Sequence, residues 1–392
     1  MNRYKTTALA CYIGYITQAM LLTLPSLLFT VFFNKFGISL SALGLIISVN
    51  FCIQICMDII SVFFIDKFGY RPPAVFAHIC CFLGMIGLAL LPNILSHKYI
   101  AICLPIFLSS VGGGLIEVLA SPIIENLPTE KKSASMSFLH SFFCWGQLLT
   151  VLLSTLYFYL FGIDNWSILP VFWSIIPLTN IILFIKVPLP SLVKEKKTMS
   201  IRALFKNKFF LFFLLLMLCS GAAEQSMSQW ASLFAETGLG VSKAVGDLLG
   251  ISLFAGLMGI SRIFYTVKCE KLNLYKFILF SGLLCIVSYL ITVFSPYPLL
   301  SLFGCALCGL SVGIMWPGTF SIASKNFPYG GTAMFGLLAF FGDIGCSLGP
   351  GMVGFLSGTL TQQGLKFGLM FATIFPVILL IAITFIMKRK QQ

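Results

Sequence analysis

Three carboxylates stand inside long apolar stretches of this sequence: Glu117, Glu224 and Asp343. A charged side chain is unfavourable in hydrocarbon, by about 2.5–3.5 kcal/mol on insertion scales, so each of them needs a partner, water or a function. At a rise of about 1.5 Å per residue, all three fall within about 10 Å of the middle of their predicted helices. Carboxylates at one depth indicate a water-filled cavity in which they bind protons or substrate. The alternative is that each is neutral or hydrogen-bonded and only holds helices together.

Glu117 is the strongest candidate for proton transfer. The glycine run 112–114 precedes it and would let a neighbouring backbone approach closely. Pro122 follows it and would free backbone carbonyls toward a cavity. We therefore expect Glu117 to load and release a proton, and we assign Glu224 and Asp343 to proton coupling with it.

Amide, imidazole and indole side chains lie in the same apolar stretches. They would supply hydrogen bonds for hydroxyl groups and ring faces for C–H surfaces, the mixture that a sugar or related polyol requires. Asn50 and Gln54 are one helical turn apart and share a face. The alternative role for any of these side chains is hydrogen bonding between helices or, for tryptophan, contact with lipid. The candidate substrate-binding residues are Gln18, Asn50, Gln54, His140, Trp145, Gln147, Gln225, Gln229, Trp230 and Trp316.

The composition explains why these polar groups stand out. Of 392 residues, 58% are hydrophobic and 9% are charged, and the mean hydropathy is +1.00, which excludes an ordinary water-soluble domain. Long unbroken apolar runs, without the alternation of a strand barrel, predict membrane-spanning helices of about 20 residues. Twelve spans are predicted, at 7–33, 40–64, 74–92, 99–125, 135–161, 165–186, 208–236, 243–267, 275–295, 298–326, 332–358 and 364–387.

The polar stretch 187–207 divides the spans six and six and predicts a cytoplasmic linker between an N-terminal bundle, 1–186, and a C-terminal bundle, 208–392. Gly114 and Pro122 are spaced like Gly309 and Pro317, which indicates duplication of a six-helix half. The fold class is therefore all-α integral membrane, with twelve helices in two pseudo-symmetric bundles.

The net charge of +13 is distributed unevenly between the loops. If both termini are cytoplasmic, the predicted outer segments keep only Lys35, Lys98, Lys243 and Lys366 among the lysines and arginines. Because basic residues accumulate on the cytoplasmic side, this pattern predicts a multi-pass protein of a bacterial inner membrane with both termini inside. The positive charge then meets anionic lipid headgroups rather than nucleic acid.

Two patterns point away from enzymes and metals. Nearly all of the thirteen cysteines lie in apolar segments, so we interpret them as small packing residues and expect no metal or cofactor. The segment 309–313 satisfies G-x-S-x-G, but a nucleophile elbow requires a strand-to-helix turn, and this segment lies mid-helix. We expect no enzymatic activity.

Local motifs resemble a known transporter family. The segment 66–71, DKFGYR, resembles the D-[RK]-x-G-x-[RK] signature of the major facilitator superfamily, with Val62 in place of its leading glycine. Residues 112–122 with Glu117 are similar to the span-four stretch of fucose permease, whose glutamate serves in proton coupling. Segment 316–321, WPGTFS, resembles span ten of the same group. The sequence is thus similar to the fucose permease and glucose/mannose:proton symporter group, although Leu21 stands where that group has a span-one acid.

The resemblance implies a brace on the cytoplasmic side. Asp66 and Arg71 belong to the signature loop, whose role in the superfamily is to hold that side together. Asp58 and Arg262 lie near the cytoplasmic ends of the second and eighth predicted spans. Opposite charges there would complete a gate, or each would extend to the interface instead. The predicted cytoplasmic gate is Asp58, Asp66, Arg71 and Arg262.

The sequence favours a monomeric secondary transporter that works by alternating access around a cavity between two halves. The leading hypothesis is proton-coupled uptake of a sugar-like solute. Proton-driven efflux of amphiphilic drugs is the alternative within transport, because acidic residues in an apolar cavity would also serve it. A non-transporting solute sensor is the alternative from another class.

Overall fold

The computed structural model describes residues 4–128, 132–189, 199–268, 273–327, 329–358 and 364–391. Within these residues the secondary structure is helical, and twelve helices or runs of helices are long and apolar enough to cross a membrane. Their bounds follow the predicted spans closely; Leu274–Phe294, for example, was expected at 275–295. The twelve-helix fold class is confirmed.

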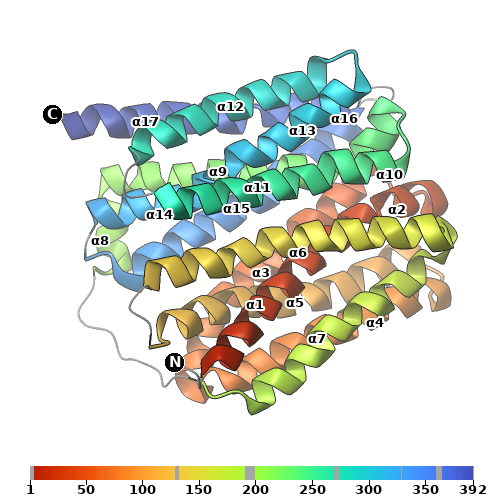
Figure 1. Ribbon diagram of the computed structural model, residues 1–392, viewed down its shortest axis with the longest axis horizontal. Coiled ribbons are helices and arrows are strands. Elements are labelled where there is room, and N and C mark those ends of the chain that lie inside the picture. Colours follow the sequence, from red (N-terminus) through yellow and green to blue (C-terminus); the bar gives the residue numbers. More distant parts are fainter. Residues whose placement is uncertain are drawn as a thin grey trace. The chain divides into compact units, whose positions relative to one another are not determined.

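The chain divides into two compact units, of which the first comprises Met1–Ser39 and Val49–Val193. Within it, α1 packs against α5, α6 and α7, and α4 packs against α5 and α7 (Figure 1). The helices up to the linker are α1 (Lys5–Leu27), α2 (Phe29–Phe36), α3 (Leu40–Phe68), α4 (Arg71–Ile94), α5 (Lys98–Glu125), α6 (Lys132–Phe161), the 3₁₀ helix η2 (Ile163–Ile168) and α7 (Leu169–Lys186).

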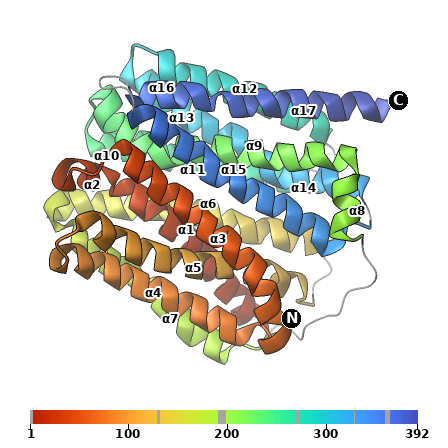
Figure 2. The ribbon, with the colours of Figure 1, turned by 180° about the vertical axis from the view of Figure 1, so that it is seen from behind.

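The second unit comprises Lys194–Gln392 and also Leu40–Ser48, the first turns of α3. Its central helix is α9, which packs against α13, α14, α15 and α17 (Figure 2). Its helices are α8 (Ile201–Lys206), α9 (Lys208–Leu233), η3 (Phe234–Gly238), α10 (Lys243–Gly246), η4 (Asp247–Ser252), α11 (Leu253–Lys268), α12 (Leu274–Phe294), α13 (Pro298–Val312), α14 (Met315–Asn326), α15 (Gly331–Gly358), α16 (Gly364–Ala372) and α17 (Ile374–Gln391). The elements η3 and η4 are π-helical turns.

Proline breaks two of the spans. Pro25 has no N–H to donate into its helix, and α1 ends two residues later, at Leu27, before α2 continues the span from Phe29. Pro317 likewise cannot donate to the carbonyl of Gly313, and the tenth span is divided there into α13 and α14. Both breaks leave backbone carbonyls without their usual helical partner.

Large apolar side chains remain exposed on the outer faces of the spans. Phe76 and Leu104 are each 53% exposed, and Phe355 is 65% exposed. Side chains of this kind are rarely left in water in such numbers, but they are compatible with acyl chains. The surface therefore agrees with the composition in requiring a bilayer.

The segment that satisfies G-x-S-x-G lies within α13 and at its end. A Cβ on Gly309 would stand 2.1 Å from the carbonyl oxygen of Phe254 on α11, so glycine is needed there for close helix packing. Because the segment has no strand-to-helix turn, the packing interpretation holds and the nucleophile elbow does not.

Candidate functional site

Glu117 lies on α5 and is half-buried against α1. The amide nitrogen Nε2 of Gln18, on α1, donates a hydrogen bond of 2.5 Å to its carboxylate oxygen Oε2. Gln18 is itself only 3% exposed, so the two side chains hold each other in the packed interior of the first unit. This partner is neutral, and among the residues that the structure describes no basic side chain forms an ion pair with the carboxylate.

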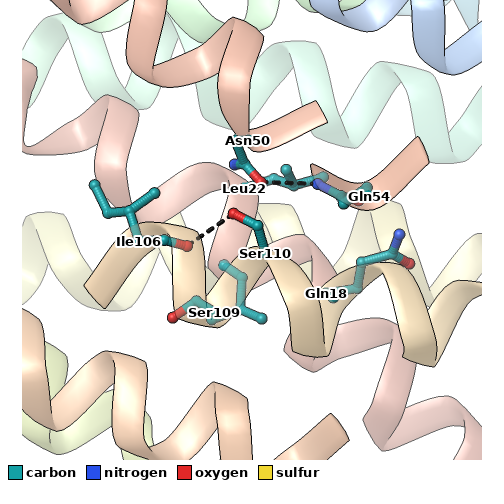
Figure 3. Close-up of a pocket in the computed structure, with 9 residues that line it drawn as sticks. Gln18, Leu22, Asn50, Gln54, Ile106, Ser109 and Ser110 are labelled. Carbon is teal, nitrogen blue, oxygen red and sulfur yellow. Dashed lines mark hydrogen bonds between the residues drawn. The ribbon is translucent and has the colours of Figure 1, made fainter. Parts of the chain in front are cut away.

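A small pocket of the first unit opens beside Gln18 (Figure 3). The cavity volume is about 10 Å³, which is room for about one water molecule. Amide and hydroxyl groups share the lining with apolar side chains and with one glycine. The lining residues are Gln18, Leu21, Leu22, Asn50, Gln54, Ile106, Ser109, Ser110 and Gly113.

The polar groups of this pocket are pre-oriented by bonds within their own helices. Gln54 Nε2 donates to Asn50 Oδ1 at 2.9 Å, as expected for side chains one turn apart, and Ser110 Oγ donates to the carbonyl of Ile106 at 2.7 Å (Figure 3). Among the residues that the structure describes, none of the lining side chains carries a formal charge. The pocket is therefore suited to an uncharged polar group.

The glycine run before Glu117 brings α3 and α5 together. A Cβ on Gly114 would lie 2.9 Å from the Cα of Gln54, closer than real Cβ atoms approach a backbone. Only glycine allows this separation, and the close approach predicted from the sequence is present. The same contact sets Gln54 beside the helix that carries Glu117.

His140, Trp145 and Gln147 all lie on α6. The His140 ring meets the Tyr15 ring edge-on, with centroids 5.2 Å apart. Gln147 is 4% exposed and Trp145 is half-buried. None of the three lines the small pocket.

The second unit pairs its buried glutamate with an arginine. Glu224 on α9 is 7% exposed and Arg262 on α11 is 9% exposed, and the Oε2 of Glu224 lies 3.5 Å from the Nη2 of Arg262. The same Nη2 lies 3.7 Å from the sulfur of Met258. The structure thus brings together a residue expected at a cytoplasmic gate and one expected in proton coupling.

An amide ladder extends from this ion pair along α9. Gln225 Nε2 donates to Glu224 Oε1 at 3.4 Å, and Gln229 Nε2 donates to Gln225 Oε1 at 3.0 Å. Trp230, the next residue, is fully buried and its indole N–H donates to the carbonyl of Pro350 at 3.0 Å. The ladder joins polar groups that the sequence analysis had assigned separately to proton coupling and to substrate.

Trp316 on α14 packs close to the part of α15 that carries Asp343. Asp343 is 4% exposed, and a Cβ on its neighbour Gly342 would stand 2.2 Å from the Trp316 ring. The half-buried Trp316 indole therefore packs on the α15 backbone one residue from the carboxylate.

Arg71 binds the end of α7. Its guanidinium donates to the carbonyls of Phe184, at 3.3 Å, Val187, at 2.9 Å, and Ile185. It thereby satisfies carbonyls that the helix end leaves open. The side chains of Asp58 and Asp66 lie outside the described part of the structure.

Two buried polar clusters were not predicted from the sequence. In the first unit, Asn180 Nδ2 lies 2.8 Å from His78 Nε2 and donates to the carbonyl of Ala10 at 3.0 Å. In the second, Lys243 Nζ lies 3.0 Å from Asp247 Oδ2. The spacing of Lys243 and Asp247, four residues apart, was a visible signal for the second cluster. For the first, His78 and Asn180 are far apart in sequence, so no local pattern pointed to them.

The sequence model that describes the Major Facilitator Superfamily matches residues 11–350, which is most of the chain. The chain belongs to the major facilitator superfamily. The resemblance seen in the sequence motifs is thereby confirmed, and the chain is a multi-pass membrane transporter rather than an enzyme. The search of curated proteins returned no significant match.

Solved structures share the fold at low sequence identity. A D-xylose–proton symporter is 14% identical, with a TM-score of 0.78 over 98% of this chain and 97% of that one. The fucose:proton symporter of E. coli is 15% identical, with a TM-score of 0.67 over 98% and 99%. A nucleoside transporter is 16% identical, with a TM-score of 0.74 over 97% and 99%. At these identities the likeness establishes the fold of the superfamily.

Proposed function

We propose that this transporter couples the uptake of a sugar or related uncharged polar solute to protons by alternating access, with Glu117 as the proton carrier. The observation that carries the proposal is the neutral hydrogen-bond partner of Glu117. Its hydrogen-bond partner is the amide of Gln18, and the adjacent pocket is lined by uncharged polar groups. A carboxylate can change its charge in such a place without leaving an opposite charge uncompensated.

The second unit offers the contrasting case. Protonation of Glu224 would leave the guanidinium of Arg262 buried without its counter-charge, which is strongly unfavourable. We therefore assign Glu224 to charge compensation of Arg262. Asp343 remains a candidate for the binding of protons or substrate, since it is buried on the helix that packs against α9.

The pocket has room for about one water molecule, and it is the polar side chains around it that support the proposed substrate class. The amides of Gln18, Asn50 and Gln54 offer both donors and acceptors, which match hydroxyl groups. A lining without charge disfavours cationic drugs as the principal substrates. The substrates after which the structural neighbours are named, D-xylose, fucose and nucleosides, are polar and rich in hydroxyl groups, which supports this class.

The first experiment identifies the substrate and tests coupling together. The purified protein is screened by thermal shift with D-xylose, L-fucose and uridine, and compounds that stabilise it are tested for uptake in proteoliposomes with an imposed proton gradient. We expect gradient-driven uptake in the wild type and its loss in Glu117→Gln. Asp164→Asn, which removes an exposed carboxylate, is the matched control and should transport normally.

The outcomes separate the alternatives. Gradient-driven uptake that survives in Glu117→Gln removes Glu117 from the mechanism. If no solute is taken up but expression of the gene raises tolerance to amphiphilic drugs, efflux replaces uptake as the function. Binding without transport or counterflow would identify a sensor.

We also propose that the protein acts as a monomer in a bacterial inner membrane, with both termini in the cytoplasm. The observation that supports the orientation is the accumulation of basic residues in the segments assigned to the cytoplasmic side. Cysteine-accessibility labelling of single cysteines at positions 35 and 202 in intact cells tests the orientation. If an impermeant reagent labels position 202 but not position 35, the proposed orientation is wrong and the termini lie outside.

A further inference from the structure

A line of polar side chains leads from Glu117 toward the end of the first unit that carries the N-terminus of α1. Ser121 follows Glu117 by one turn on α5, so their Cβ atoms lie roughly 5–6 Å apart on one face of that helix. The Ser121 hydroxyl lies 3.0 Å from the hydroxyl of Tyr15 on α1. The His140 ring of α6 is edge-on to the Tyr15 ring.

We propose that Ser121, Tyr15 and His140 form a proton path between Glu117 and the N-terminal end of α1, the side expected to face the cytoplasm. This inference rests on the proposed proton coupling at Glu117 and names the route by which that proton leaves. The three helices that supply it pack against one another in the first unit (Figure 1).

The two hydroxyl groups have the chemistry that a relay requires. Either oxygen of the Tyr15–Ser121 pair can be the donor, so the hydrogen bond can reverse as a proton passes. Ser121 accepts a proton from the Glu117 carboxyl and gives its own to Tyr15. Because the edge-on ring contact is not itself a hydrogen bond, the Tyr15 proton passes to a ring nitrogen of His140 by way of one water molecule. The net change is a Glu117 carboxylate and a His140 imidazolium, and no covalent bond other than O–H and N–H is altered.

Burial distinguishes the members of the path. Tyr15 is 3% exposed, whereas Ser121 and His140 are half-buried. Because the Tyr15 phenol is buried between two more accessible groups, water cannot easily take its place in the proton path. His140 suits the outer position because the ordinary pKa of imidazole lies between pH 5 and 8. This assignment gives His140 a role different from direct substrate binding.

The test follows the proton at Glu117 without a substrate. In reconstituted protein, infrared spectroscopy after an alkaline pH jump measures the decay of the protonated-carboxyl band that Glu117→Gln removes. We expect Tyr15→Phe and Ser121→Ala each to slow this decay by roughly 10²-fold or more, in line with the roughly 10²–10⁴-fold that a positioned proton donor or acceptor contributes. The double variant should be no slower than the slower single variant, because both changes interrupt one path.

Tyr12→Phe is the matched control. Tyr12 lies one turn away on α1 and stacks on Phe142 with ring centroids 4.5 Å apart, a contact that phenylalanine preserves. It should leave the decay rate unchanged, and melting temperatures verify that all variants are folded. His140→Asn should slow the decay as Tyr15→Phe does.

Wild-type decay in both Tyr15→Phe and Ser121→Ala would overturn the path, as would equal slowing in Tyr12→Phe. The absence of a carboxyl band that depends on Glu117 would also overturn it, since no proton would enter the path. These results differ from failure of the proposed function. A protein that exchanges its Glu117 proton along the path but shows no proton-driven uptake would refute only the coupling to transport.

Discussion

Glu117 and Glu224 occupy comparable positions in two spans but have different partners. Glu117 accepts a hydrogen bond from the neutral amide of Gln18, whereas Glu224 lies 3.5 Å from the guanidinium of Arg262. Neutralising Glu117 leaves behind a neutral amide partner, whereas neutralising Glu224 leaves the buried cation of Arg262 without its counter-charge. The partner of a buried carboxylate, more than its depth, indicates whether it is suited to carry a proton.

The ion pair gives the largest predicted effect. Arg262→Met leaves Glu224 buried without its counter-charge, so we expect the free energy of unfolding to fall by about 3–5 kcal/mol. Denaturation in mixed micelles measures it. The neutral pair Glu224→Gln with Arg262→Met should recover most of this loss, and a double variant as unstable as the single one would contradict the assignment.

The corresponding change in the first unit should be milder. Gln18→Leu removes one hydrogen bond to Glu117, so we expect a loss of about 1.5–3 kcal/mol when the carboxylate is ionised. The loss should shrink in acid, where the carboxyl group is neutral and needs the donor less. Denaturation at two pH values checks it, and a penalty that grows in acid would show that Gln18 does not serve the ionised carboxylate.

The glycine contact beside Glu117 can be tested with a matched glycine. Gly114→Ala forces a Cβ against the α3 backbone and should cost about 1–3 kcal/mol in stability. Gly256→Ala, on α11, has open space for its Cβ, so it should be neutral or stabilise the fold by about 0.5–1 kcal/mol through helix propensity. Equal effects of the two substitutions would mean that the α3–α5 contact does not depend on glycine.

The smallest effect is expected at the pocket wall. Asn50→Ala removes one uncharged hydrogen-bonding group, worth about 0.5–1.5 kcal/mol, so the half-saturation concentration for the transported solute should rise roughly 2–12-fold. Initial uptake rates over a range of solute concentrations measure it. An unchanged half-saturation concentration would exclude Asn50 from solute binding.

Much of the fold could be predicted because hydropathy alone defines spans in a bilayer. The bounds of the spans and the close contact at Gly114 could be predicted because each depends on the types of residues that are near one another in the sequence. The pairing of Arg262 with Glu224 could not be predicted in this way, because it depends on how α9 and α11 are rotated about their axes. Helices that are apolar on nearly every face carry little periodic signal for that rotation.

The same limit explains why His140 was predicted as a site residue and His78 was not. His140 was selected for its place in a span, yet His78 is the more buried, at 1% exposure, and its bond to Asn180 joins helices distant in sequence. Hydropathy treats the two residues alike. Only the packing of α4 against α7 distinguishes them.

The most direct test compares proton movement in two variants that each neutralise one glutamate. Solute is added to proteoliposomes containing a pH-sensitive dye, for Glu117→Gln and for the neutral pair Glu224→Gln with Arg262→Met. Proton entry should be abolished in Glu117→Gln while solute exchange continues, and it should persist in the neutral pair. Proton entry that persists in Glu117→Gln and disappears in the neutral pair would contradict the assignment of Glu117 as the proton carrier.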